Sequence, residues 1–328
     1  MARTPVRGEV NRPVLAFVLR RAGATLLLLL ALSLLVFTLL YLAPGDVARN
    51  MLGTRNVTPE ALAQVRARYH LDEPFLWQYW RWLSHAVTGD FGTSIRTGGP
   101  IGSLMLGKTG VTAATAGLAF LMSVLVGVPT GIATAVRRGH RLDRLLVAAS
   151  VVGVSAPGFA VGLLLLYVFA LGLGWFPIYG TGAGFADALW HLVLPAVALA
   201  LGLGAFVVKL TRAAVIRELG QDYVTFARGR GLSERAVLRI VLRNAAIPIV
   251  TSLGLMVAYL FGGTVLIEVT FALPGLGSLM QEAVLFKDIP VVQALTLVVA
   301  LVVSATALLV DLSYLLIDPR VRARTVRR

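Results

Sequence analysis

Long uncharged apolar stretches recur along the chain and are separated by shorter polar segments. The first, 22–42, runs for 21 residues without a charge, enough at about 1.5 Å per residue to cross the ~30 Å hydrocarbon core of a bilayer. It is too long for the apolar core of a signal peptide, so we expect it to be retained. Runs of spanning length lie at about 20–42, 109–136, 145–173, 191–210, 246–268 and 291–316. The pattern predicts an all-α integral membrane protein with six transmembrane helices.

The polar segment 211–245 follows the fourth run and has a helical pattern of its own. Four of its larger side chains recur at the spacing that lines one face of an α-helix. These are Val215, Leu219, Tyr223 and Phe226. Gly229 and Gly231 then interrupt the pattern, and Ser233 can cap the start of a second helix. The segment is predicted to be a helix-turn-helix outside the bilayer.

The composition supports the membrane assignment. Of 328 residues, 57% are apolar and 14% are charged, and the mean hydropathy is +0.82. The net charge of +14 does not indicate nucleic-acid binding, because the basic residues lie in short segments between apolar runs rather than on one soluble face. The chain has no cysteine, which excludes disulfides and thiolate metal sites, and we expect no metal site.

The basic residues predict an orientation. The N-tail 1–19 with the start of the first run, the loop after the second run, the 209–243 segment and the C-tail 317–328 together hold 22 of the 30 Lys and Arg residues. The positive-inside rule therefore places both termini and the helix-turn-helix in the cytoplasm. An even number of spans agrees with termini on one side.

The segment 43–108 is then external, and it is too long to be a simple connection. It contains the aromatic cluster FLWQYWRWL, for which two interpretations stand: interfacial anchors at the lipid headgroups, or a small folded domain that meets a soluble partner. The candidate contact residues for a soluble partner are Trp77, Tyr79, Trp80 and Arg96.

A phosphate-binding pattern also occurs in this segment. Gly102, Gly107, Lys108 and Thr109 match G-x-x-x-x-G-K-[ST]. A nucleotide site needs a preceding strand and a helix N-terminus in water, whereas this pattern leads into an apolar run and lies on the predicted outer side. We expect these residues not to bind nucleotide.

Several longer motifs resemble one family over nearly the whole chain. They are LAPGDVARN, LDEPFLWQYWRWL, GDFGTSI, WHLVLPAVALAL, DYVTFARGRGLSERAVLRIVLRNAAIPIV, EVTFALPGLG and DLSYLLIDPRVR. The chain is similar to the inner-membrane permease subunits of bacterial dipeptide/oligopeptide ABC importers. The resemblance implies half of a translocation pathway for di- or oligopeptides, built with a second homologous permease. It also implies two ATPase subunits that hold Mg-ATP, and an extracytoplasmic binding protein that delivers the ligand.

The family's cytoplasmic coupling loop, the EAA motif, corresponds to Thr225, Phe226 and Ala227 followed by Gly231. Thr225 stands where the motif has an acid, and Phe226 where it has its first alanine. The resemblance implies that this segment docks on an ATPase, whereas a basic amphipathic helix can also lie on anionic lipid. The expected ATPase-coupling residues are Tyr223, Thr225, Phe226, Ala227, Arg228, Gly229, Gly231, Leu232 and Ser233.

The resemblance implies a transport subunit without catalytic residues or a cofactor of its own. Nickel, haem or another ligand of the same importer class is an alternative to peptide, and a stand-alone secondary transporter is an alternative mechanism. One acid within the sixth run, Asp311, is expected to have a structural role, as a partner of Lys209.

Overall fold

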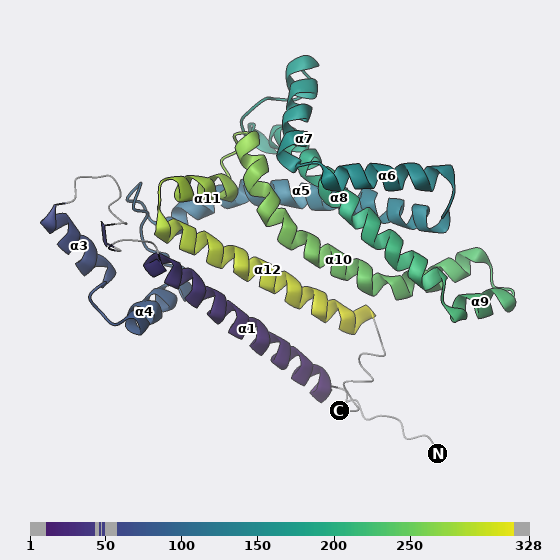
Figure 1. The fold of residues 1–328 in the computed structure, drawn as a ribbon, viewed down its shortest axis with the longest axis horizontal. Coiled ribbons are helices and arrows are strands. Elements are labelled where there is room, and N and C mark those ends of the chain that lie inside the picture. The colour runs from purple at the N-terminus through teal and green to yellow at the C-terminus, as the bar shows by residue number, and fades with distance from the viewer. Residues whose placement is uncertain (1–10, 43–45, 47, 50–57, 318–328) are drawn as a thin grey trace.

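The computed structural model describes residues 11–42, 46, 48, 49 and 58–317. The expected C-tail, and most of the segment between the first run and residue 58, lie outside the described residues. Within the described ranges the chain is helical, with one isolated bridge between Thr93 and Pro100 (Figure 1). The helices are α1 (Asn11–Leu42), α3 (Pro59–Tyr69), α4 (Phe75–Val87), α5 (Ile101–Val136), α6 (Arg141–Ser155), α7 (Gly158–Leu165), the π-helix η1 (Leu166–Gly172), α8 (Gly184–Leu219), α9 (Asp222–Gly229), α10 (Glu234–Thr270), α11 (Leu276–Leu285) and α12 (Ile289–Ile317).

Within the part of the chain that the structure describes, five helices are long and apolar enough to cross a membrane: α1, α5, α8, α10 and α12. Five of the six predicted apolar runs fall inside them. Three extend well beyond the runs, since α5, α8 and α10 have 36, 36 and 37 residues. The second run was expected to start at 109, but α5 begins eight residues earlier, at Ile101, with Pro100 as its N-cap.

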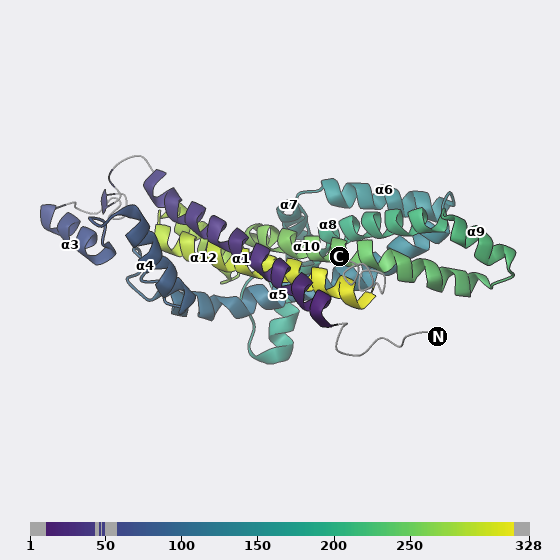
Figure 2. The same ribbon diagram turned by 90° about the horizontal axis from the view of Figure 1, so that it is seen from below.

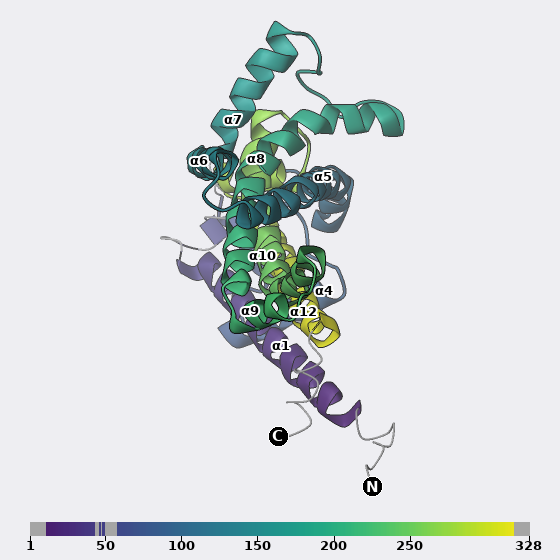
Figure 3. The same ribbon diagram turned by 90° about the vertical axis from the view of Figure 1, so that its right-hand side faces the viewer.

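The third predicted run, 145–173, is not one straight span. It is divided between α6 and the α7–η1 pair, which meet at an angle of 102°. The cause lies in the sequence, because Pro157 clashes with a helical conformation at the preceding residue, and Ala156 is extended with ψ of 126°. The structure therefore has five candidate spans, or six if the bent pair counts as one. Figure 3 shows α7 extending away from the bundle.

Glycines bring α5 and α8 into close contact. A Cβ atom at Gly127 would lie 3.1 Å from the carbonyl oxygen of Gly204, and one at Gly131 would lie 2.9 Å from that of Val208. Small residues four apart let two helix backbones approach in this way, as the spacing Gly127/Gly131 predicts. The α5–α8 pair is the central contact of the bundle.

Short helices lie at the two ends of this bundle, and Figures 1 and 2 agree on their placement. At one end, which we call the α9 end, α9 joins the tips of α8 and α10. At the other, the α4 end, α3 and α4 lie near the C-terminal end of α1, and α11 lies beside the start of α12 (Figure 1). Each end has its own apolar cluster, around Val215, Val224 and Val241 at the α9 end and around Ile101, Leu279 and Leu295 at the α4 end. Both ends are therefore folded structures rather than loose connections.

Candidate functional site

The predicted helix-turn-helix is built from the end of α8, the short helix α9 and the start of α10 (Figure 1). Ser233 caps α10, because its hydroxyl oxygen accepts a hydrogen bond from the Ala236 amide at 3.4 Å. The turn before it requires a glycine at one position, since Gly231 has φ of +79°. Gly229, in contrast, is the last residue of α9 and has a helical conformation. Only the second of the two predicted glycines is a conformational requirement.

The expected single apolar face is interrupted, which corrects the helical pattern derived from the sequence. α8 ends at Leu219, Gly220 caps it, and a new helix begins at Asp222. The break rotates α9, so that Val224 is buried at 1% exposure and Phe226 is 72% exposed. Gly220, a residue common at helix ends, was the sequence signal for this break.

The expected coupling residues form one patch around α9. Tyr223 and Ala227 are partly buried against the apolar cluster at this end. The exposed members of the patch are Thr225, Phe226, Arg228, Gly229, Gly231, Leu232 and Ser233. The Tyr223 hydroxyl donates to Glu218 at 2.9 Å, and burial raises the pKa of the phenol above its ordinary value. The patch thus has an apolar base and an accessible outer face.

Arg228 has a partner within the chain. Its guanidinium makes two hydrogen bonds to the Glu234 carboxylate, at 2.9 and 3.0 Å. This pair joins α9 to α10 across the Gly231 turn, and it raises the pKa of Arg228 further above its ordinary value. An acid of a partner protein would therefore compete with Glu234 for Arg228.

A second ion pair at this end, not identified from the sequence, fixes the base of the element. The guanidinium of Arg212 binds both carboxylate oxygens of Asp143, at 2.9 and 3.0 Å, and the Gly139 amide donates to the same carboxylate. The Asp143 side chain is only 4% exposed. Because the two residues are 69 positions apart, no sequence periodicity connects them. The pair holds the start of α6 against α8.

The phosphate-binding pattern lies within a helix. Gly102, Gly107, Lys108 and Thr109 belong to the first three turns of α5, and among the described residues no strand precedes them. The Thr109 hydroxyl donates to the Met105 carbonyl in the same helix. These residues do not form the loop of free amides that cradles phosphate. That they bind no nucleotide remains a prediction.

At the α4 end, the aromatic cluster is divided between two faces of α4. The Tyr79 ring faces inward, where its hydroxyl bonds to that of Ser33 at 2.8 Å and its ring lies 5.6 Å from that of Phe37. Trp77 and Trp80 are 64% and 63% exposed. Tyr79 thus joins α4 to α1, and only the two tryptophans are available to lipid or to a partner.

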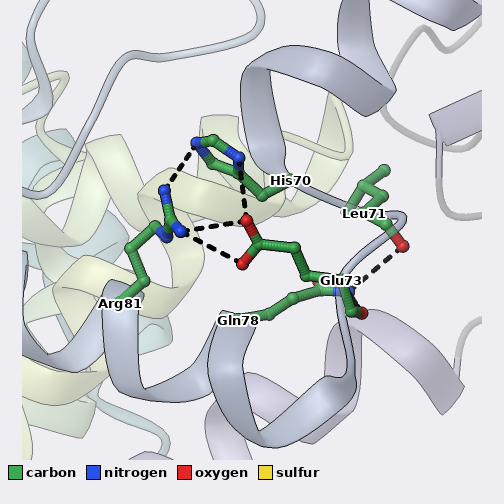
Figure 4. A network of polar contacts seen from close by, with 5 residues as sticks. All are labelled: His70, Leu71, Glu73, Gln78 and Arg81. Carbon is green, nitrogen blue, oxygen red and sulfur yellow. Dashed lines mark hydrogen bonds and ion pairs between the residues drawn. The ribbon is translucent and has the colours of Figure 1, made fainter.

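A polar network fixes the turn between α3 and α4, as Figure 4 shows. Glu73 accepts from Arg81 at 2.9 Å and lies 3.3 Å from a ring nitrogen of His70. Gln78, 6% exposed, donates to the carbonyl oxygens of Leu71 and Glu73. The network borders a cavity of about 570 Å³ between α1, α4 and the start of α12.

The fourth candidate contact residue, Arg96, lies in the loop between α4 and α5. Its guanidinium is 3.2 Å from the Glu282 carboxylate of α11, and it stacks 4.6 Å from the Phe286 ring centroid. Arg96 is separate from the exposed tryptophans, because its charged group is directed to α11. The four candidates do not form one surface.

The acid of the sixth run has a different partner from the one expected. Asp311 of α12 pairs with Arg21 of α1, not with Lys209. The pair joins the two helices, which lie side by side in Figures 1 and 2. Among the described residues, no group of three or more His, Asp or Glu side chains could hold a metal ion.

Helices long and apolar enough to span a bilayer, with a folded element at each end, define a helical membrane protein. Residues 127–323 match the family described as "Binding-protein-dependent transport system inner membrane component", and residues 14–104 match the N-terminal region of the same group. The chain belongs to this family of permease subunits of ABC transporters.

Curated relatives match over almost their full length. The "Probable peptide ABC transporter permease protein y4tP" of Sinorhizobium fredii is 36% identical over 310 residues, covering 93% of this chain and 99% of the relative. The glutathione transport system permease protein GsiC of Escherichia coli K12 is 37% identical over 314 residues, covering 94% and 99%. A chain in the solved structure described as inward facing conformations of the MetNI methionine ABC transporter has a similar fold over 66% of this chain and 96% of its own, with a TM-score of 0.55 at 16% identity.

Proposed function

We propose that this chain is one of two permease subunits of an ATP-driven importer for di- or oligopeptides in a bacterial inner membrane. A second homologous permease completes the pathway, two ATPase subunits bind and hydrolyse Mg-ATP, and an extracytoplasmic binding protein delivers the ligand. The patch around α9, from Tyr223 to Ser233, docks on an ATPase. The observation that carries this proposal is the exposed outer face of a helix whose inner face is fixed in an apolar cluster.

The geometry of α9 suits a groove on a partner. Val224 anchors the helix, so that Phe226, which is 72% exposed, is presented on a fixed backbone. A large apolar side chain held in this way loses little further conformational entropy on binding, which favours a protein contact. On a lipid surface the same helix would lie along the membrane plane with its apolar face toward the acyl chains. That face is already occupied here by α8 and α10.

The orientation follows from charge. The α9 end holds Arg137, Arg138, Arg141 and Arg144 in the α5–α6 region, in addition to the arginines of α9 and α10. α1 begins and α12 ends on the side facing the α9 end (Figure 1). The positive-inside rule then places the α9 end and both termini in the cytoplasm and the α4 end outside.

The ligand class rests on the named relatives, of which one is described as a peptide permease and others as glutathione permeases. Glutathione is itself a tripeptide, so the two descriptions agree in chemistry. A peptide import assay with the reconstituted complex tests this part. Uptake of nickel or haem without peptide uptake would instead favour the alternative ligands of the same importer class.

A matched pair of glycine substitutions tests the coupling role. At Gly231 the φ of +79° makes any side chain strained, and a β-branched one most of all, whereas Gly262 lies within α10, outside the patch, and has nothing within 4 Å of a Cβ atom. Gly231→Val is expected to abolish copurification of the ATPases and peptide uptake, with membrane insertion intact. Gly262→Val is expected to retain both. Normal ATPase binding and uptake by Gly231→Val would contradict the proposal.

A further inference from the structure

α11 is fixed at its start by a buried carboxylate from α10. Glu268 has no exposed surface. It accepts a hydrogen bond from the Thr112 hydroxyl of α5 at 2.6 Å and from the Ser278 amide of α11 at 3.0 Å. The Thr112 hydroxyl oxygen accepts in turn from the Leu276 amide at 2.8 Å. One carboxylate and one hydroxyl thus join three helices.

The turn before α11 fits closely around this carboxylate. A Cβ atom at Gly275 would lie 2.2 Å from the Glu268 carboxyl carbon. One at Gly277 would lie 2.6 Å from the Cα atom of Val265. Only glycine allows this approach, so the start of α11 has a fixed position on α10.

The far end of α11 is held by a second buried carboxylate, and its partners come from an external loop. Asp288, 3% exposed, precedes α12. It accepts hydrogen bonds from the Ser94 hydroxyl and from the amides of Ile95 and Arg96, the last two at 3.2 and 3.3 Å. These donors are more than 190 residues away in sequence, so they connect two distant parts of the chain. Arg96 adds its ion pair with Glu282, one turn before the end of α11.

The loop 90–100 has an inner and an outer side. Ser94 is buried at 3% exposure against Asp288, whereas Gly92, Thr97, Gly98 and Pro100 are exposed. α11, for its part, contacts α5, α10 and α12, three of the candidate spanning helices. A force on the open side of the loop therefore reaches the ends of three spanning helices through the α11 contacts.

We infer that Asp288 and Glu268 are positioning residues for transport, and that the loop 90–100 and α11 move as one unit with Glu268 at its fixed point. Docking of the extracytoplasmic binding protein on the open side of the loop displaces α11 through Asp288. The displacement changes the packing among α5, α10 and α12. This inference rests on the proposed function, because it needs a binding protein that activates the complex.

The test uses the full importer in proteoliposomes with its loaded binding protein. The readout is the stimulation ratio, the rate of ATP hydrolysis with binding protein divided by the rate without it. Asp288→Asn keeps the side-chain size but removes the charge that receives three hydrogen bonds. It is expected to lower the ratio by at least about 5-fold, the lower end of typical coupling between sites. Glu60→Gln, the same type of change at an exposed position on α3, is the control and should keep the ratio.

Restoring the stimulation ratio with a cross-link distinguishes a positioning role of Asp288 from general damage to the fold. Because the chain has no cysteine, Arg96→Cys with Glu282→Cys can be joined specifically by a bifunctional methanethiosulfonate that reductant removes. In the Asp288→Asn background, in a complex whose other subunits also lack cysteine, the cross-link is expected to restore the ratio and dithiothreitol to abolish it again. If Asp288→Asn does not fold, Ser94→Ala, which removes one donor, replaces it in the same design.

The outcomes are distinct. No stimulation of the unmodified complex by any binding protein would overturn the proposed function. Normal stimulation of the unmodified complex together with a normal ratio for the folded Asp288→Asn or Ser94→Ala variant would overturn only the inference. A lowered ratio that the cross-link cannot restore would also overturn it, because loop and α11 would then not act as one unit.

Discussion

The short helices α9 and α11 are held in opposite ways. α9 has one fully buried side chain, Val224, and its polar link, the pair of Arg228 and Glu234, lies at the surface. α11 is bounded by two buried carboxylates. Glu268 accepts from a hydroxyl of α5, and Asp288 accepts from a hydroxyl of the loop before α5. In the two proposals, α9 docks on a partner through its free outer face, and α11 relays movement through internal contacts at both ends.

The difference also concerns distance along the chain. The hydrogen bonds of Tyr223 to Glu218 and of Arg228 to Glu234 join residues five and six positions apart. The polar contacts at the two ends of α11 include pairs separated by 156 and 194 positions. Substitutions around α11 are therefore expected to affect the packing of several helices at once. Surface substitutions on α9 are expected to affect mainly the binding of the partner.

The largest loss of stability is expected for the buried ion pair just beneath α9. Arg212→Leu leaves the buried Asp143 carboxylate without its guanidinium, and removing one member of such a pair is among the most destabilising changes known. The melting temperature in detergent should fall clearly. Arg217→Leu, an exposed arginine of the same helix, should leave it unchanged. Equal melting temperatures would show that the bidentate pair does not hold α6 to α8.

A smaller but clear loss is expected at α11 from added volume. Gly277→Ala places a methyl group 2.6 Å from the backbone of α10, which cannot yield easily. Overpacking of this kind costs about 1 to 3 kcal/mol. Gly262→Ala is the control, since nothing lies within 4 Å of its Cβ position. Thermal unfolding of both variants measures the difference, and a tolerated Gly277→Ala would remove the contrast between α11 and α9.

The smallest effect is expected for the surface pair of α9. Glu234→Gln removes the carboxylate that binds Arg228, yet exposed ion pairs contribute little to stability. No measurable change in melting temperature is expected. The released Arg228 can instead pair with an ATPase, so ATPase affinity, measured by titration of the reconstituted complex, should stay constant or rise. Weaker ATPase binding would show that the pair shapes the docking patch.

Much of the fold could be predicted because apolar length and charge are local properties of the sequence. The five spanning helices, the Ser233 cap and the glycine turn at Gly231 all follow from such local signals. The bend at Pro157 and the break at Gly220 occur at residue types that often interrupt helices. Membrane helices also tolerate proline and glycine, so the residue type alone does not predict whether a helix breaks there.

The contacts that position the two ends could not be predicted. Asp143 with Arg212, and Asp288 with Ser94, meet only after the helices have packed, and neither pair has a periodicity that marks it. The predicted pairing of Asp311 with Lys209 was wrong for the same reason. Lys209 was predicted because it is basic, whereas the packing of α12 against α1 brings Arg21 to Asp311. Long-range polar contacts depend on the tertiary arrangement, which one sequence does not display.

The close contact between α5 and α8 has a mechanical consequence. Each helix has 36 residues and is therefore about 54 Å long, well beyond the ~30 Å apolar core of a membrane. Where backbone lies against backbone, at Gly127 and Gly131, there are no long side chains to bend or slide. Of the two, α5 reaches from the α9 end, where Ala135 lies in the apolar cluster, to the α4 end, where Ile101 lies in the other. A tilt of about 5° moves the far tip of a helix of this length by about 5 Å, so a small rotation of α5 at the α9 end is sufficient to displace its start at the α4 end.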